Sequence, residues 1–188
     1  MKIVNAGIDE DVISGERPIQ ESSMFISKLI IYKKDEQFGK WKIANCSAKM
    51  KAYTCRKPSD GKTWGTPAPV DDSEGTDFPH KFEQHQYVVM YVAEKVNFLQ
   101  ARLKCEDMNA NLASLHSRGE IEFLKSVMQS NSTLMEDAWI GMVYNVTDTN
   151  AHTTWIDGSS YDYRYTAPGE PKYLGKGEYC GQACCFKR

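Results

Sequence analysis

Residues 98–180 decide the fold. This stretch begins with a helical segment that contains Cys105, continues with Asn-Leu-Ala-Ser-Leu-His-Ser (111–117), and then has a second helical segment. Four short motifs follow in order: Trp-Ile-Gly-Met (139–142), Trp-Ile-Asp-Gly-Ser (155–159), Gly-Glu-Pro-Lys (169–172) and Glu-Tyr-Cys (178–180). Asn97 can cap a helix over 98–108. Ser-Arg-Gly-Glu at 117–120 is a capping box, and the apolar residues after it recur at helical spacing. From residue 131 onward, short strands and turns are expected. This stretch therefore predicts an α+β fold with two helices and a long irregular loop.

The composition is that of an ordinary soluble globular protein. The chain has 188 residues, of which 41% are hydrophobic and 26% charged, so it can hold one or two domains with a sizeable core. Its formal net charge of −2 does not favour nucleic-acid binding. No apolar run approaches the roughly 20 residues that a membrane-spanning helix needs. The longest run, 87–93, reads as a strand.

Cysteines and sequons indicate an oxidising compartment. Six cysteines fit a secreted or extracellular protein. Glycosylation sequons begin at Asn131 and Asn145, in what should be surface loops, and a third begins at Asn45. The N-terminus lacks the apolar core of a signal peptide. We therefore expect an extracellular or secreted protein of which this chain is a fragment.

The chain divides into four segments by composition. Residues 1–24 are polar without a period, which predicts disorder. Residues 25–57 carry two expected strands, at 24–32 and ending at 52–55, and the pattern Trp-x4-Cys-x8-Cys from Trp41. Residues 58–77 are rich in proline and glycine, which is typical of a linker. Residues 78–188 hold the decisive stretch, preceded by strands expected near 81–84 and 87–93.

The order and spacing of these motifs resemble those of a C-type lectin domain over about residues 78–180. The resemblance implies a small antiparallel sheet with two helices and the long loop as the ligand site. Cys105 and Cys180 match two family cysteines whose partners should follow Cys180, but the chain ends at Arg188. Residues 39–55 instead resemble the end of such a domain, with Cys46 and Cys55 matching the missing partners. The chain is thus similar to the end of one domain followed by the front of another, as in tandem-domain, mannose-receptor-like proteins.

Two interpretations of this order stay open. In the first, the chain was cut from a tandem-domain protein and holds two incomplete domains. In the second, the pieces complement each other in permuted order, with Cys55–Cys105 and Cys46–Cys180 bonded. Separate halves would leave an open sheet edge and unpaired cysteines. Cys184 and Cys185 fall outside the family pattern.

The resemblance also implies a calcium site, which this chain has altered. Sugar-binding members hold calcium through a Glu-Pro-Asn type triplet, a Glu before the cysteine, and an Asn-Asp pair after a Trp. Glu170 and Glu178 match two of these ligands. Lys172 brings an ammonium in place of the amide, and Lys42-Ile43 follows Trp41. Calcium takes six to eight oxygens, so we expect a degenerate calcium site and no required cofactor. The predicted ligand-binding residues are Glu170, Pro171, Lys172, Tyr173 and Glu178.

The resemblance implies a non-enzymatic extracellular module that binds carbohydrate, with a glycan or glycoprotein as its partner. A calcium-independent protein-binding domain is the alternative, and a non-functional fragment of a tandem-domain lectin is a third reading. No catalytic motif is present, and the four histidines lack metal or triad spacing. Trp139 and Trp155 are expected in the core. The loop tyrosines suit glycan stacking, protein recognition or loop packing, and we expect packing for this group: Tyr161, Tyr163, Tyr165 and Tyr173.

Overall fold

A computed structural model describes residues 39–60, 78–130, 137–172 and 174–183, all within one compact unit of residues 34–188. Its elements are β1 (Trp41–Asn45), β2 (Met50–Pro58), β3 (His80–Phe82), β4 (His85–Val96), α2 (Phe98–Glu106), β5 (Asn111–Leu112), α3 (Arg118–Ser130), β6 (Ala138–Val146), β7 (Ala151–Trp155) and β8 (Gly177–Ala183). The disorder predicted at 1–24, the strand predicted at 24–32, and residues 61–77 of the linker predicted at 58–77 lie outside the described residues. So do Asn131, Tyr173, Cys184 and Cys185. Pro58, at the start of that predicted linker, is the last residue of β2.

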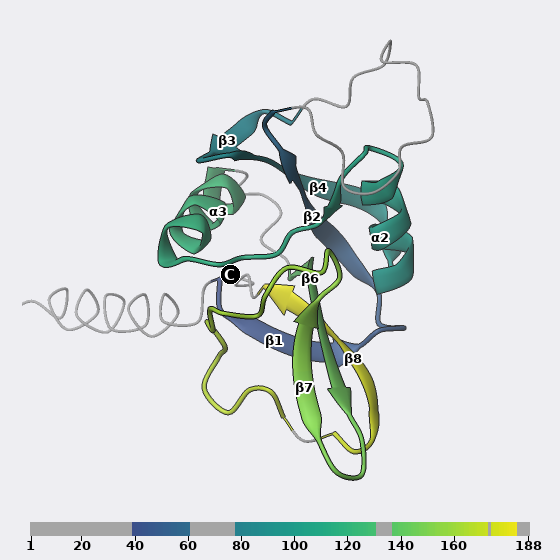
Figure 1. Cartoon of the computed structure of the whole chain (residues 1–188). Coiled ribbons are helices and arrows are strands. Elements are labelled where there is room, and N and C mark those ends of the chain that lie inside the picture. Colours follow the sequence, from purple (N-terminus) through teal and green to yellow (C-terminus); the bar gives the residue numbers. More distant parts are fainter. Residues whose placement is uncertain (1–38, 61–77, 131–136, 173, 184–188) are drawn as a thin grey trace, which may run out of the picture. The chain divides into compact units, whose positions relative to one another are not determined.

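One sheet contains both the early segment at 39–58 and the strands that follow residue 78. Its strand order is β1-β8-β6-β2-β4-β3, with β5 added to β2 and β7 to β6 (Figure 1). The early strand β2 pairs antiparallel with β4 and parallel with β6, while β1 pairs antiparallel with β8. The segment at 39–58 therefore fills the centre and one edge of a sheet that later residues build. This is the permuted arrangement in which the two pieces form one fold.

Two disulfides connect the same two pieces. Cys46 is bonded to Cys180 across 134 residues, and Cys55 to Cys105 across 50 residues. The first bond joins the turn after β1 to β8, and the second joins β2 to α2. These are the two pairs that the resemblance implies. Each bond links the segment at 39–60 to the rest of the fold.

Apolar residues on both faces of the sheet form two cores. Successive residues of a strand point to opposite faces, so in β2 Ala52 enters one core while Tyr53 and Cys55 enter the other. The first core includes Ile121 and Leu124 of α3, and the second includes Phe98 of α2. Figure 1 shows α2 and α3 on either side of β2. Burial on both faces explains why five consecutive residues of β2 and seven of the nine residues of β6 are buried.

Both helices begin at capping boxes. The Glu120 N–H donates to Ser117 Oγ at 3.1 Å, and the Ser117 N–H donates to Glu120 Oε2 at 3.1 Å, as the sequence predicted. At α2, Asn97 caps the helix as expected, and Gln100 completes a second box that the sequence reading missed. The helix ends at Glu106, two residues earlier than predicted, because the chain turns through Asn109 at φ 52°. Strand β4 is longer than the predicted 87–93.

The sequon at Asn145 does not lie in a loop, contrary to the prediction. Asn145 belongs to β6 and faces His152 of β7 and Glu178 of β8. The apolar run that begins at Ala138 continues as a strand up to Val146, which is buried. The turn begins only after it, where Thr147 and Asn150 bond to each other.

A buried ionic network holds β2, α3 and the end of β7 together. Arg56 pairs with Glu120 at 3.2 Å and with Asp157 at 3.3 Å, and all three side chains are at most 6% exposed. The Tyr87 hydroxyl donates to Glu120 at 2.8 Å, and burial raises the pKa of this hydroxyl, so it remains a donor. Ser114 and Ser159 donate to Asp157. The predicted turn residue Asp157 is thus also the charged anchor of the loop that follows β7.

Gly141 lies where β6 passes closest to another backbone segment. A Cβ at this position would lie 2.5 Å from the Leu112 carbonyl oxygen, which cannot move without breaking the β5–β2 pairing. We therefore expect Gly141→Ala to destabilise the protein by about 1–3 kcal/mol, as overpacking does in cores. Chemical denaturation measures this change.

Gly119→Ala is the matched control for Gly141. A Cβ there would meet the end of the Phe82 ring at 3.0 Å, and the substitution favours the helix by up to about 1 kcal/mol. It should leave the free energy of unfolding unchanged or raised. Equal losses from both substitutions would contradict the role assigned to the Leu112 carbonyl.

Candidate functional site

The loop between β7 and β8 folds back over Trp41 and Trp155. Trp41 is fully buried, and its ring packs against three other aromatic rings. The distances between ring centroids are 5.2 Å to Trp155, 6.2 Å to Tyr161 and 6.4 Å to Tyr163. The backbone of Trp41 also hydrogen-bonds to Tyr165 and Ala167. Burial raises the pKa of the Tyr161 hydroxyl. Tyr161, Tyr163 and Tyr165 therefore all pack on the first core, as expected for this group.

His116 fastens the same loop from the side of α3. One ring nitrogen lies 3.0 Å from the Asp162 carboxylate and the other lies 3.1 Å from the Ser159 hydroxyl. The hydrogen bond with His116 lowers the pKa of Asp162. The ring also lies 5.9 Å from that of Trp155. His116 is therefore a packing and loop-holding residue, in line with its placement before a helix cap.

A small open cleft lies between the sheet and this loop. Even with the open solvent at its mouth included, its empty volume is only about 210 Å³, and its lining includes Trp41, Ile43, Met142, Tyr144, Tyr161 and Glu170. Small-molecule pockets usually measure roughly 300–1,000 Å³. The cleft is thus too small to enclose a whole ligand. A ligand placed here would contact the cleft and the surface of the surrounding loop together.

Glu170 is held by the protein itself. Its carboxylate accepts the Ile43 N–H at 3.4 Å and the Lys172 N–H at 3.2 Å, and the Lys172 ammonium lies 3.6 Å away. The Glu170 side chain is 3% exposed, whereas that of Lys172 is 67% exposed. The peptide bond between Glu170 and Pro171 is cis. The Glu170 carboxylate is therefore buried, whereas the Lys172 ammonium is exposed at the surface.

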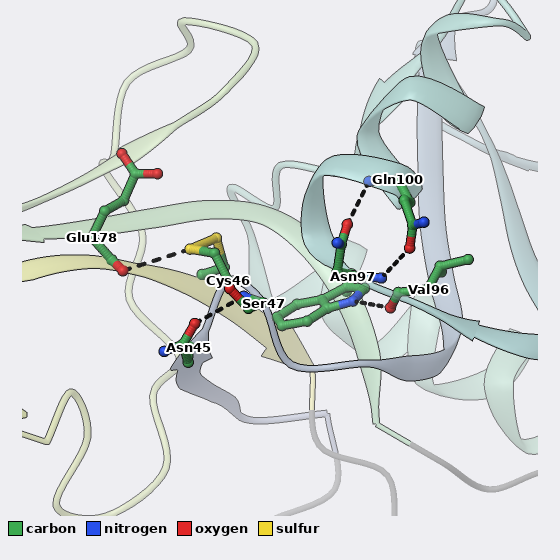
Figure 2. The surroundings of a disulfide bond; sticks show 9 residues. Asn45, Cys46, Ser47, Val96, Asn97, Gln100 and Glu178 are labelled. Carbon is green, nitrogen blue, oxygen red and sulfur yellow. Dashed lines mark hydrogen bonds between the residues drawn. A yellow bond between two sulfur atoms is a disulfide. The ribbon is translucent and has the colours of Figure 1, made fainter.

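Glu178 lies beside a disulfide. Its carboxylate and the sulfurs of Cys46 and Cys180 are within 4.8 Å of one another, and its carbonyl oxygen lies 3.7 Å from the Cys46 sulfur (Figure 2). Within the described ranges this is the sole grouping of three or more potential His, Cys, Asp or Glu ligands. Cys46 and Cys180 are bonded to each other and therefore offer no thiolate to a metal ion. Among the residues that the structure describes, no such grouping includes Glu170.

Two of the residues predicted from the sequence to bind ligand line this cleft. Of the predicted residues, Glu170 and Pro171 line the cleft, Lys172 caps Glu170, and Glu178 lies beside the disulfide. Tyr144 and Thr153 also line the cleft and were missed. Tyr144 on β6 lies opposite Thr153 on β7. The sequence signal that could have found Tyr144 is its position two residues after Met142, because alternate side chains of a strand point to the same face of the sheet.

The two-core sheet, the capped helices, the two disulfides and the long loop define the C-type lectin-like class of α+β folds. Residues 94–187 match the Lectin C-type domain, and the chain belongs to this family of non-enzymatic recognition modules. The predicted fold class and family are therefore confirmed. The tandem-domain context stays a prediction. No helix in the described part of the chain is long and apolar enough to cross a membrane.

Three relatives show the extent of the likeness. The chain is 33% identical over 103 residues to the low affinity immunoglobulin epsilon Fc receptor of Homo sapiens, covering 54% of this chain and 30% of the receptor. It is 36% identical over 91 residues to ladderlectin of Oncorhynchus mykiss, covering 48% and 47%. It is 35% identical over 95 residues to lactose-binding lectin l-2 of Anguilla japonica, covering 48% and 54%. The chain thus spans about half or less of each relative. No solved structure matches at a significant level.

Proposed function

We propose that this chain is an extracellular recognition module that binds carbohydrate without calcium, through the surface around Glu170, Pro171 and Lys172. The observation that carries this proposal is the internal pairing of Glu170 with the Lys172 ammonium and two backbone N–H groups. A divalent cation at Glu170 would have to displace all three donors. It would also meet the repulsion of the ammonium, worth several kcal/mol at 4 Å and an effective dielectric near 20.

Carbohydrate is the favoured ligand class for two reasons. The first is membership of the C-type lectin domain family, together with likeness to a protein named as a lactose-binding lectin. The second is chemical, since an exposed ammonium can donate hydrogen bonds to sugar hydroxyls while a half-buried tyrosine such as Tyr144 offers an aromatic wall. The disulfides support an extracellular location, because such bonds persist in oxidising compartments.

Protein recognition is the second candidate. Leu174 is 51% exposed and follows the exposed Lys172 by two residues in the sequence, and protein interfaces commonly combine apolar and charged side chains. One relative is named as an immunoglobulin receptor. A protein ligand would use the same surface, so binding experiments separate the two candidates directly.

Thermal unfolding tests calcium independence first. A calcium ion bound at 100 times its Kd would add about 2.7 kcal/mol, which raises the Tm of a domain of this size by roughly 5–10 °C. We expect the oxidised protein to unfold cooperatively at the same temperature in calcium and in chelator. A clear rise in calcium would contradict the proposal.

Glycan binding tests the ligand class. On a glycan array we expect signals that persist in chelator and that Lys172→Ala weakens roughly tenfold or more, because a charge-assisted hydrogen bond contributes about 1.5–3 kcal/mol. Lys176→Ala is the matched control, since Lys176 is another exposed loop lysine, 65% exposed and paired with Asp148. It should bind like the unaltered protein. Signals that vanish in chelator would refute the proposal, and an array without signals would favour the protein ligand.

A further inference from the structure

The sequon Asn45-Cys46-Ser47 lies at the exposed end of an edge strand. Strand β1 pairs only with β8 in the sheet order, and Asn45 is its last residue. The side chain is exposed, and its Oδ1 accepts the Ser47 N–H at 2.9 Å. Figure 2 shows the side-chain nitrogen on the opposite side from this hydrogen bond. A group attached to that nitrogen leaves the Asn45–Ser47 turn intact.

The pairing register places Asn45 in one row with residues of the cleft. Asn45 is opposite Tyr179, Tyr179 is opposite Tyr144, and Tyr144 is opposite Thr153. Directly opposed residues of neighbouring strands share a face of the sheet. Tyr144 and Thr153 line the cleft. With strands about 4.8 Å apart, Asn45 lies roughly 10 Å from Tyr144 on the cleft side.

The sequon at Asn45 is synthesised before the cysteine and the strand that it pairs with in the folded protein. Cys46 bonds to Cys180, which follows it by 134 residues. At roughly 5–20 residues per second, that partner is made about 7–27 s later. During this interval the Cys46 sulfur has no native partner and the Asn45 segment has no β8 to pair with. A glycosylating enzyme that meets the sequon in this interval meets it before the Cys46–Cys180 bond and the β1–β8 pairing can form.

We propose that Asn45 carries an N-linked glycan that flanks the cleft lined by Tyr144 and Glu170. In this modification the Asn45 Nδ2 bonds to the anomeric carbon of a polyprenyl-pyrophosphate-linked oligosaccharide. The bond from that carbon to the pyrophosphate oxygen breaks, the pyrophosphate leaves with the electron pair, and a base takes one amide proton. The glycan then borders the proposed ligand surface on the β8 side. This inference rests on the extracellular location in the proposed function.

The first test is site occupancy in the full chain, secreted from eukaryotic cells behind a leader. Enzymatic release of N-glycans in heavy-oxygen water converts an occupied asparagine into a labelled carboxylate, which peptide mass spectrometry assigns to its position. We expect the label at 45, its complete loss in Ser47→Ala, and its retention in the conservative Ser47→Thr. Asn145→Gln is the matched control and should leave the label at 45 unchanged. Secreted, disulfide-bonded protein without this label would overturn the proposal.

The second test is the position of the glycan. Hydroxyl-radical labelling should increase at Tyr179 in Ser47→Ala relative to unaltered protein, while Tyr91, on β4, keeps its labelling. A labelled Asn45 without any change at Tyr179 would overturn the placement beside the cleft. Loss of glycan binding in the array experiment would not alter the label at 45. The two proposals therefore fail separately.

Discussion

Arg56→Met will destabilise the protein by about 3–5 kcal/mol, because it leaves two buried carboxylates without their cation. Arg56 is 3% exposed and pairs with both Glu120 and Asp157, whose side chains are 6% and 1% exposed. Denaturant unfolding at neutral pH measures this loss.

Arg102→Met is the matched control for Arg56. Arg102 also pairs with a glutamate, at 2.7 Å, but both side chains are exposed, at 45% and 38%. Exposed pairs of this kind contribute only about 0.3–0.5 kcal/mol. Adding Glu120→Gln and Asp157→Asn to Arg56→Met should recover part of the lost stability. If the three changes together cost as much as the sum of their separate effects, the charge argument is wrong and Arg56 acts through packing alone.

Replacing Cys46 and Cys180 by alanine will cost about 4–5 kcal/mol, a large share of the stability of a domain this size. The chain-entropy relation gives about 4.7 kcal/mol for a loop of 100 residues, and this bond spans 134 residues. The pair Cys55 and Cys105 spans 50 residues, for which the same relation gives about 4 kcal/mol. Denaturation under non-reducing conditions measures both.

A cut chain tests what the disulfides hold together. Both bonds join the segment at 39–60 to the segment at 78–183. With a protease site inserted into residues 61–77, the two pieces should remain joined after cleavage and denaturation, and should separate in denaturant only when reductant is added. Pieces that separate without reductant would show that the cysteines pair differently. That result would support two incomplete domains in place of one permuted fold.

Much of the fold was predictable because its signals are local. The capping box of Ser117 and Glu120, the cap at Asn97, and the helical spacing of Ile121 and Leu124 each involve residues a few positions apart. The family cysteines and the Glu-Pro-Lys triplet were likewise recognisable by spacing. Errors occurred where local signals compete. Asn145 followed by Thr147 read as a loop, yet β6 continues through it because Val146 is buried.

The sequence by itself determined the two helices, the apolar faces, the candidate ligand residues and the cysteines available for pairing. Only the tertiary structure decided which segments meet. Arg56 finds Glu120 and Asp157 at separations of 64 and 101 residues, and Glu170 accepts the Ile43 N–H across 127 residues. Such contacts have no local signature, because they depend on strand order and register. The burial of Glu170 and the row from Asn45 to Thr153 arise from that register, since pairing β1 with β8 fixes which side chains share a face.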